Sequence, residues 1–129
     1  LPLAIVIGAL APLVGQGGAE AVAVIAIPLF TLGIAMSFVG LVAVRLFGRE
    51  TGGWVVLVAG LMPLLMQQFQ PLRIDHHGWQ IACFAAAFWG LSQREARRGP
   101  IIAGIAMAWG MMISIETLPL AITLFAARS

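Results

Sequence analysis

The sequence predicts an all-α fold: a helical membrane protein with about four transmembrane helices and an N-terminal partial or interfacial helix. Composition is the first observation behind this prediction. Hydrophobic residues make up 61% of the 129 residues and charged residues 9%, against about 45–50% and about 25% in soluble domains. So few charged side chains cannot form the polar surface of a soluble domain, which excludes soluble globular and disordered proteins.

The second observation is that charges and Gly/Pro clusters divide the chain into apolar segments. These segments are residues 1–14, 21–44, 54–69, 78–91 and 101–127, which we assign to one transmembrane domain covering residues 1–129. The first segment is too short for a complete span, and residues 15–20 are predicted to form a loop after it. The second is the clearest transmembrane helix, in which Pro28 is expected to introduce a kink. Because the chain begins at Leu1 without a methionine, we expect it to be a fragment of a larger protein.

Two of the predicted helices are short. At about 1.5 Å per residue, residues 54–69 cover roughly 24 Å, less than the ~30 Å thickness of the hydrocarbon layer. Residues 78–91 cover less still. If both cross the membrane, the polar segment between them lies below the membrane surface. Non-helical backbone at that depth must line a water-filled cavity or be buried in protein.

The arginines predict the orientation of the helices. Alternating spans place five of them on one side: Arg45, Arg49, Arg94, Arg97 and Arg98. The positive-inside rule assigns that side to the cytoplasm. We therefore expect a protein of the bacterial inner (plasma) membrane whose Asp75–His77 loop faces the periplasm or the exterior. The net charge of +2 is too small and too scattered for a nucleic-acid-binding surface.

Residues able to do chemistry are concentrated in the polar segment before residue 78. Asp75 and both histidines of the chain, His76 and His77, occupy consecutive positions close to Arg73. In an extended segment, Asp75 and His77 point the same way and could bind one cation. Such ligands suit Mn²⁺ or Zn²⁺, or Mg²⁺ if further carboxylates contribute. The alternative is that Asp75 only caps the helix that follows, although Gly78 stands where a capping box needs Glu or Gln. His76 and His77 would then be interfacial polar residues that bind no ligand.

Residues 73–80, Arg-Ile-Asp-His-His-Gly-Trp-Gln, resemble the second acidic motif of GT-C-type membrane glycosyltransferases. They are most similar to the Asp-His-His form of oligosaccharyltransferase catalytic subunits, where this motif lies on the external face between the third and fourth transmembrane helices. The resemblance implies that Asp75, a catalytic residue, and His77 bind a divalent metal, Mg²⁺ or Mn²⁺. It also implies a polyprenyl-phosphate-linked sugar donor at the outer face, and membrane lipid as a partner. Gln80 stands where some relatives carry an acid, so the acceptor specificity does not carry over.

Three further side chains are candidate substrate-binding residues: Arg73, Gln80 and Glu116. Arg73 is also a candidate catalytic residue, because its guanidinium could bind the leaving phosphate; alternatively it neutralises Asp75 or reaches lipid headgroups. Glu116 is predicted to lie within the last apolar segment, where a carboxylate costs at least about 2.5 kcal/mol. It is therefore expected to line a substrate cavity, to bind a proton or ion, or to form a hydrogen bond with a neighbouring helix. If the span ends at this point, Glu116 instead lies near the membrane interface.

A secondary transporter or efflux permease is the alternative function. In such a protein Glu116, His76 and His77 would share one aqueous pathway and need no metal. The glycosyltransferase hypothesis instead predicts another outward-facing acid near Asp75, from sequence outside this chain, and a fragment that is inactive alone. A third interpretation is a purely structural membrane segment without a site.

Overall fold

The structure, a computed structural model, describes residues 2–73, 76–93 and 97–126. These residues form helices and connecting turns, and no strand occurs among them, so the predicted all-α class is confirmed. In chain order the elements are α1 (Pro2–Phe47), α2 (Arg49–Gly60), α3 (Pro63–Gln67), α4 (His77–Ser92), α5 (Arg98–Ile113), the 3₁₀ helix η1 (Ile115–Thr117) and α6 (Leu118–Ala126).

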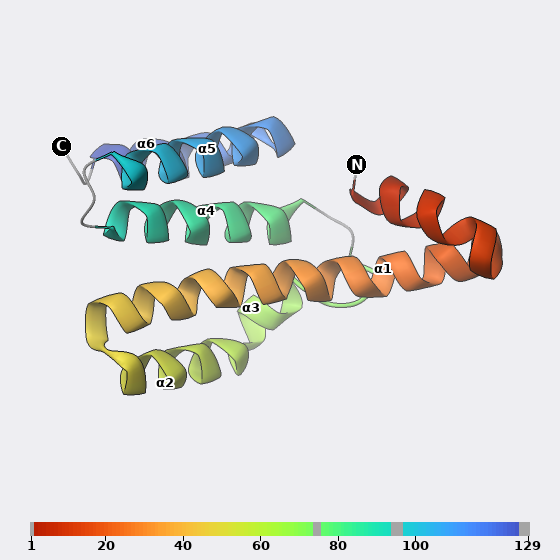
Figure 1. Ribbon diagram of the computed structural model, residues 1–129, viewed down its shortest axis with the longest axis horizontal. Coiled ribbons are helices and arrows are strands. Elements are labelled where there is room, and N and C mark those ends of the chain that lie inside the picture. Colours follow the sequence, from red (N-terminus) through yellow and green to blue (C-terminus); the bar gives the residue numbers. More distant parts are fainter. Residues whose placement is uncertain (1, 74–75, 94–96, 127–129) are drawn as a thin grey trace.

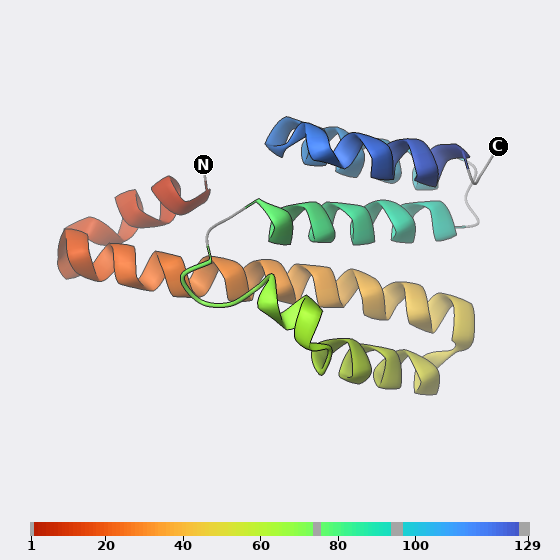
Figure 2. The same ribbon diagram turned by 180° about the vertical axis from the view of Figure 1, so that it is seen from behind.

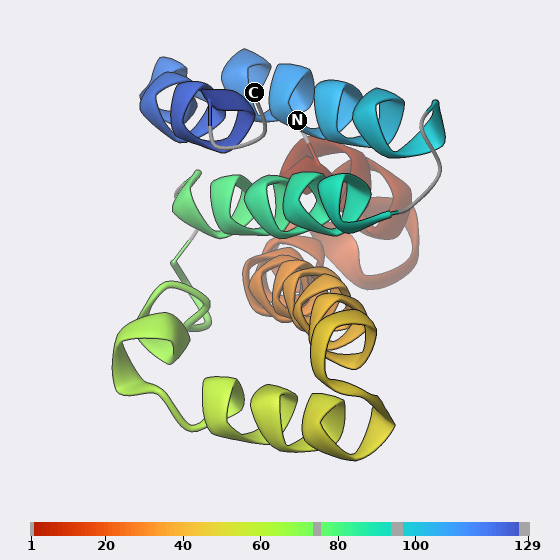
Figure 3. The same ribbon diagram turned by 90° about the vertical axis from the view of Figure 1, so that its left-hand side faces the viewer.

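The helices are stacked in layers around α1 (Figure 1). Helix α2 packs on one side of α1 and α4 on the other, and α5 and α6 form an outer layer beyond α4 (Figure 3). One buried cluster, which includes Ala87, Ala103 and Met107, joins α4 to α5 and α6. A second, formed by Ala35, Phe69 and Ala82, joins α4 to α1. Because many of these core residues are alanines, the helices approach one another closely.

Helix α1 is sharply kinked at Gly15, which has φ 77° and ψ 164°. The arm before Gly15 folds back beside the rest of the helix (Figures 1 and 2). The predicted loop over residues 15–20 is therefore wrong, because only Gly15 leaves the helical conformation. A positive φ is accessible to glycine at little cost. In the next turn, Gln16 Nε2 donates to Glu20 Oε1 at 2.8 Å, a pairing typical of a helix surface.

The structure contains fewer long helices than the four predicted spans. Among the described residues, one helix, Leu3–Phe47, is long and apolar enough to cross a membrane by length and composition. Only 22% of its most apolar stretch is buried. Helices α4 and α5 have 16 residues each, and 16 residues rise about 24 Å, less than the ~30 Å hydrocarbon layer.

Two predicted continuous segments are broken in the structure. The segment expected over residues 54–69 is interrupted before Pro63, where Met62 adopts an extended conformation with φ −74° and ψ 114°. Proline disfavours the helical conformation in the residue before it. The segment expected over residues 101–127 is interrupted at Ser114, which is extended with φ −157° and ψ 136°. The Ser114 hydroxyl then accepts from the Glu116 N–H at 3.4 Å and starts a new helix.

Pro28 anchors the loop that follows α3. Proline lacks an N–H, so the Val24 carbonyl four residues earlier has no helical donor. The Leu72 N–H donates to this carbonyl at 3.0 Å. Leu72 adopts a positive φ of 73°, which a side chain of this size rarely does. Helix α1 continues through Pro28 with helical dihedral angles, so the proline positions a neighbouring segment instead of breaking the helix.

The helix ends rich in arginine lie together. The C-terminal ends of α1 and α4 and the start of α5 occupy the same end of the molecule (Figures 1 and 2). Arg45 lies in the last turn of α1, Arg49 begins α2 and Arg98 begins α5. His77 begins α4 and so lies at the opposite end of that helix. Arg94 lies outside the described residues.

Candidate metal-binding site

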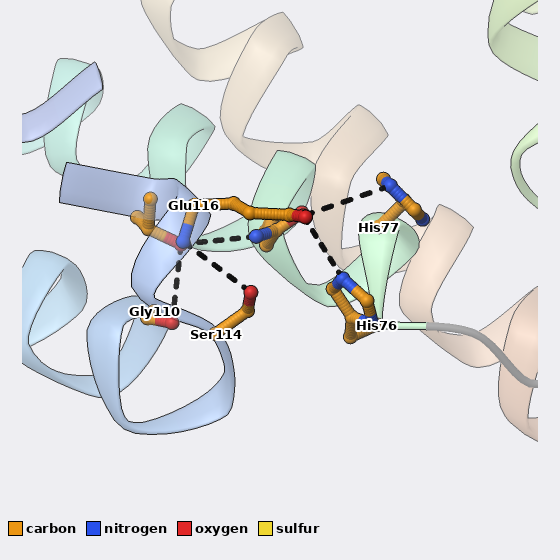
Figure 4. Close-up of polar contacts among 7 residues, drawn as sticks. His76, His77, Gly110, Ser114 and Glu116 are labelled. Atoms are coloured by element: carbon orange, nitrogen blue, oxygen red, sulfur yellow. Dashed lines mark hydrogen bonds and ion pairs between the residues drawn. The ribbon is translucent and has the colours of Figure 1, made fainter. Parts of the chain in front are cut away.

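His76, His77 and Glu116 come together at one end of the α4–α5 pair (Figure 4). Because α5 runs back along α4, the turn after α5 lies beside the first residues of α4. Nε2 of His76 lies 3.1 Å from Oε2 of Glu116, which accepts a hydrogen bond from the imidazole. Nε2 of His77 lies 3.9 Å from the same oxygen. The two imidazole rings stack with their centroids 4.5 Å apart.

The geometry of this cluster fits a divalent cation. One ligand atom from each of the three residues lies within 4.8 Å of the others. Ligands about 2.1 Å from a tetrahedral cation are about 3.4 Å apart, so small side-chain rotations would complete the site. Imidazole nitrogens with one carboxylate oxygen suit Zn²⁺ or Mn²⁺. The side chains of His76 and Glu116 are 41% and 65% exposed, so an ion can reach them from solvent.

The surroundings of Glu116 favour its charged form. The hydrogen bond with His76 is the largest cause of a lowered pKa of this carboxyl, and burial opposes it. The charges of both histidines and a hydrogen bond from Gln80 lower the pKa further. A carboxylate that stays ionised can accept hydrogen bonds or bind a cation over a wide range of pH.

The position of Glu116 differs from the one expected within a continuous apolar helix. It lies in η1, the turn between α5 and α6, and its side chain is mostly exposed. The break at Ser114 brings it to the histidines. Two features of the sequence could have indicated this break: a serine able to cap a new helix, and Pro119 in the first turn of that helix.

A cavity of about 650 Å³ opens beside the cluster. Its walls are mainly apolar and include Ile27 of α1 and Trp109 and Met112 of α5. Arg73 and His76 line it as well. Arg73 Nη1 also donates to the Gln67 carbonyl at 3.3 Å, which ties this side chain to the end of α3. The cavity therefore combines apolar walls with a cationic group and a histidine of the cluster.

Two further residues, Asp75 and Gln80, were predicted to belong to the site. Asp75 lies outside the described residues, so its predicted roles as metal ligand and catalytic residue stay predictions. Gln80, predicted to bind substrate, is buried in α4 and donates from Nε2 to Thr117 Oγ1 at 3.3 Å. Its role in substrate binding likewise stays a prediction. Sequence reasoning did not find Thr117, whose contact with Gln80 depends on the fold.

Comparison of the chain with protein-family models, with curated proteins and with solved structures found no match.

Proposed function

We propose that this chain is part of a GT-C-type integral membrane glycosyltransferase that uses a polyprenyl-phosphate-linked sugar donor and a divalent cation. The observation that carries the proposal is the cavity of about 650 Å³, which shares His76 with the candidate cation cluster. A lipid-linked phosphate has an apolar chain and an anionic head. The apolar walls suit the chain, and Arg73 with the cluster suits the head.

The distribution of apolar and charged residues supports a membrane location. Most of the apolar stretch of α1 is exposed, and its exposed side chains include Ile25, Leu29 and Phe30. We place α1 across the membrane and assign α2–α3, α4, α5 and η1–α6 to shorter segments packed beside it. The positive-inside rule then puts the arginine-rich helix ends in the cytoplasm. In this arrangement the histidines lie on the outer side of the membrane, at the depth of the cavity.

The side chains of the site have complementary roles in sugar transfer. His76, His77 and Glu116 would hold the cation, which supplies electrostatic stabilisation of the charge that develops on the leaving phosphate. Arg73 would orient the phosphate through its paired N–H donors. Trp109 and the other apolar walls would exclude water from the lipid chain. Asp75 is proposed as a further cation ligand and catalytic residue, and Gln80 and Glu116 as residues that contact the donor.

A proton-coupled transporter is the second candidate, and one observation favours it. Glu116 contacts both histidines in a single exposed cluster, as a proton pathway would require. A transporter would use this cluster without a metal. Dependence of the activity on a divalent cation therefore separates the two functions.

The test measures sugar release from a synthetic polyprenyl-phosphate-linked donor by the full-length protein in proteoliposomes. We expect activity with Mn²⁺ and none with a chelator, and a loss of at least about 100-fold in Glu116→Gln or His77→Ala. Glu20→Gln is the matched control, because Glu20 pairs with Gln16 near the kink of α1. Full activity in chelator, or full activity of Glu116→Gln, would contradict the proposal. Chelator-resistant proton-coupled uptake in the same vesicles would favour the transporter.

A further inference from the structure

A chain of buried polar groups lies behind the exposed cluster. Gln80 is 7% exposed and Thr117 is fully buried. Gln80 Nε2 donates to Thr117 Oγ1 at 3.3 Å, and Thr117 Oγ1 donates to the Gly110 carbonyl at 3.1 Å. These two hydrogen bonds therefore connect α4, η1 and the last turn of α5. Buried polar groups with satisfied hydrogen bonds favour one geometry, because any other arrangement leaves a donor or acceptor without a partner.

Two of these hydrogen-bonded residues, Gln80 and Thr117, lie close in sequence to residues of the cluster. The Gln80 N–H donates to the His76 carbonyl at 3.1 Å, so Gln80 lies one helical turn after the histidines. Residues three and four positions apart share one helix face, which directs Gln80 to the same side as His76 and His77. Thr117 directly follows Glu116. One buried hydrogen bond thus joins the two segments that supply the three candidate ligands.

Close packing leaves Thr117 little freedom to move. A Cβ atom at Gly110 would lie 2.9 Å from Thr117 Cγ2, closer than side-chain atoms normally approach. The threonine methyl group therefore rests directly against the backbone of α5. Packing and hydrogen bonding together fix the turn that carries the carboxylate.

We infer that Gln80 and Thr117 are positioning residues that hold Glu116 within reach of the two histidines, so that the three side chains bind a cation together. This inference rests on the cation site of the proposed function. It assigns Gln80 to the support of the metal ligands. Groups that orient metal ligands typically contribute 10- to 100-fold to metal affinity.

The test of this role is the affinity of the full-length protein for Mn²⁺. It is measured in nanodiscs by electron paramagnetic resonance, with Mn²⁺ as the probe. Thr117→Val keeps the shape of the side chain but removes the hydroxyl, so we expect the Kd for Mn²⁺ to rise about 10- to 100-fold. Thr117→Ser keeps the hydroxyl and should remain within about 3-fold of the wild-type affinity. Thr123→Val is the matched control, since the exposed Thr123 hydroxyl donates only to the Pro119 carbonyl in α6.

Melting temperature, measured on the same samples, separates positioning from a general structural role. Gln80→Leu removes the same hydrogen bond from the other side and repeats the test if Thr117→Val does not fold. Wild-type Mn²⁺ affinity in a folded Thr117→Val or Gln80→Leu, with affinity lost in Glu116→Gln, would overturn the positioning role and leave the cation site intact. Failure of Thr117→Ser to retain affinity would also overturn it. Wild-type affinity in both Glu116→Gln and His76→Ala would instead overturn the cation site of the proposed function.

Discussion

The pKa of Glu116 is lowered mainly by His76, a residue 40 positions earlier in the chain. The hydrogen bond with His76 favours the charged carboxylate and lowers its pKa. A carboxyl whose pKa is lower in the folded state stabilises the fold at pH values above its unfolded pKa. That contribution is lost as the pH falls through the folded pKa. Acidification should therefore weaken the contact between η1 and the start of α4.

Removing the imidazole tests this coupling. In His76→Ala the pKa of Glu116 should rise toward the ordinary value of a glutamate, because the main favourable interaction with the carboxylate is gone. Carbon-13 NMR of the labelled side-chain carboxyl, followed through a pH titration, would measure the change. The signal of the Glu20 carboxyl, which pairs with Gln16, is the internal control. An unchanged Glu116 titration would show that the His76 contact does not form in solution.

At this scale the sequence identified part of the candidate site. Arg73, His76 and His77 stand out because so few other residues of the chain can do chemistry. The association of Glu116 with the histidines could not be predicted, because it depends on where α5 ends and on how α5 packs beside α4. Thr117 was missed for the same reason, since a lone threonine in an apolar stretch carries no pattern.

Among the helices, α1 shows how a proline can organise a neighbouring segment. Pro28 leaves the Val24 carbonyl without a helical donor, and Leu72 supplies one from the loop after α3. This contact holds the backbone next to Arg73 against α1. The arginine therefore reaches the cavity from a fixed position, although it lies in a turn.

Restoring the missing donor should release the loop. In Pro28→Ala the new N–H can bond to the Val24 carbonyl and compete with Leu72. We expect the Leu72 amide to exchange hydrogen about 2- to 10-fold faster, which corresponds to the loss of one hydrogen bond. Hydrogen–deuterium exchange would measure this rate. Pro12→Ala in the N-terminal arm is the matched control, and equal exchange in both variants would contradict the anchoring role of Pro28.

Local patterns predicted helices better than helix ends. The apolar stretch over residues 78–91 became α4 (His77–Ser92) almost without change. The breaks at Met62 and Ser114 were missed because apolar residues continue across them, and hydropathy alone does not register a change of backbone direction. The Gly15 kink was missed in the opposite sense, because a polar, glycine-rich stretch suggested a loop where the helix resumes at once.

For the molecule as a whole, the distribution of charge implies an orientation. The arginine-bearing end of α1 lies with the C-terminal end of α4 and the start of α5 (Figures 1 and 2). His77 begins α4 and so lies at its other end. Composition predicted a helical membrane protein, and α1 is long enough to cross a membrane. The layer order could not be predicted, because small residues allow close approach on many helix faces.

Labelling of single cysteines in the full-length protein tests the orientation. In a cysteine-free background, Gln70→Cys and Thr51→Cys place exposed thiols before the histidines and after α1, respectively. A membrane-impermeant maleimide should label Gln70→Cys in intact cells and Thr51→Cys only after permeabilisation, because the proposed topology, based on the positive-inside rule, places the arginine-rich end in the cytoplasm. Labelling of both sites in intact cells, or the reverse pattern, would contradict this topology.

The Val24–Leu72 contact also determines how the position of Arg73 relative to the histidines could be changed. Wherever a proline stands in a helix, the carbonyl four residues before it lacks a helical donor. Moving that proline by one helical turn would shift the carbonyl that binds the loop by about 5.4 Å along the helix axis. The guanidinium of Arg73 would then move relative to the imidazoles of His76 and His77, although neither segment had changed in sequence. The distance between Arg73 and the two histidines can thus be changed by a substitution in α1, far from both in the sequence.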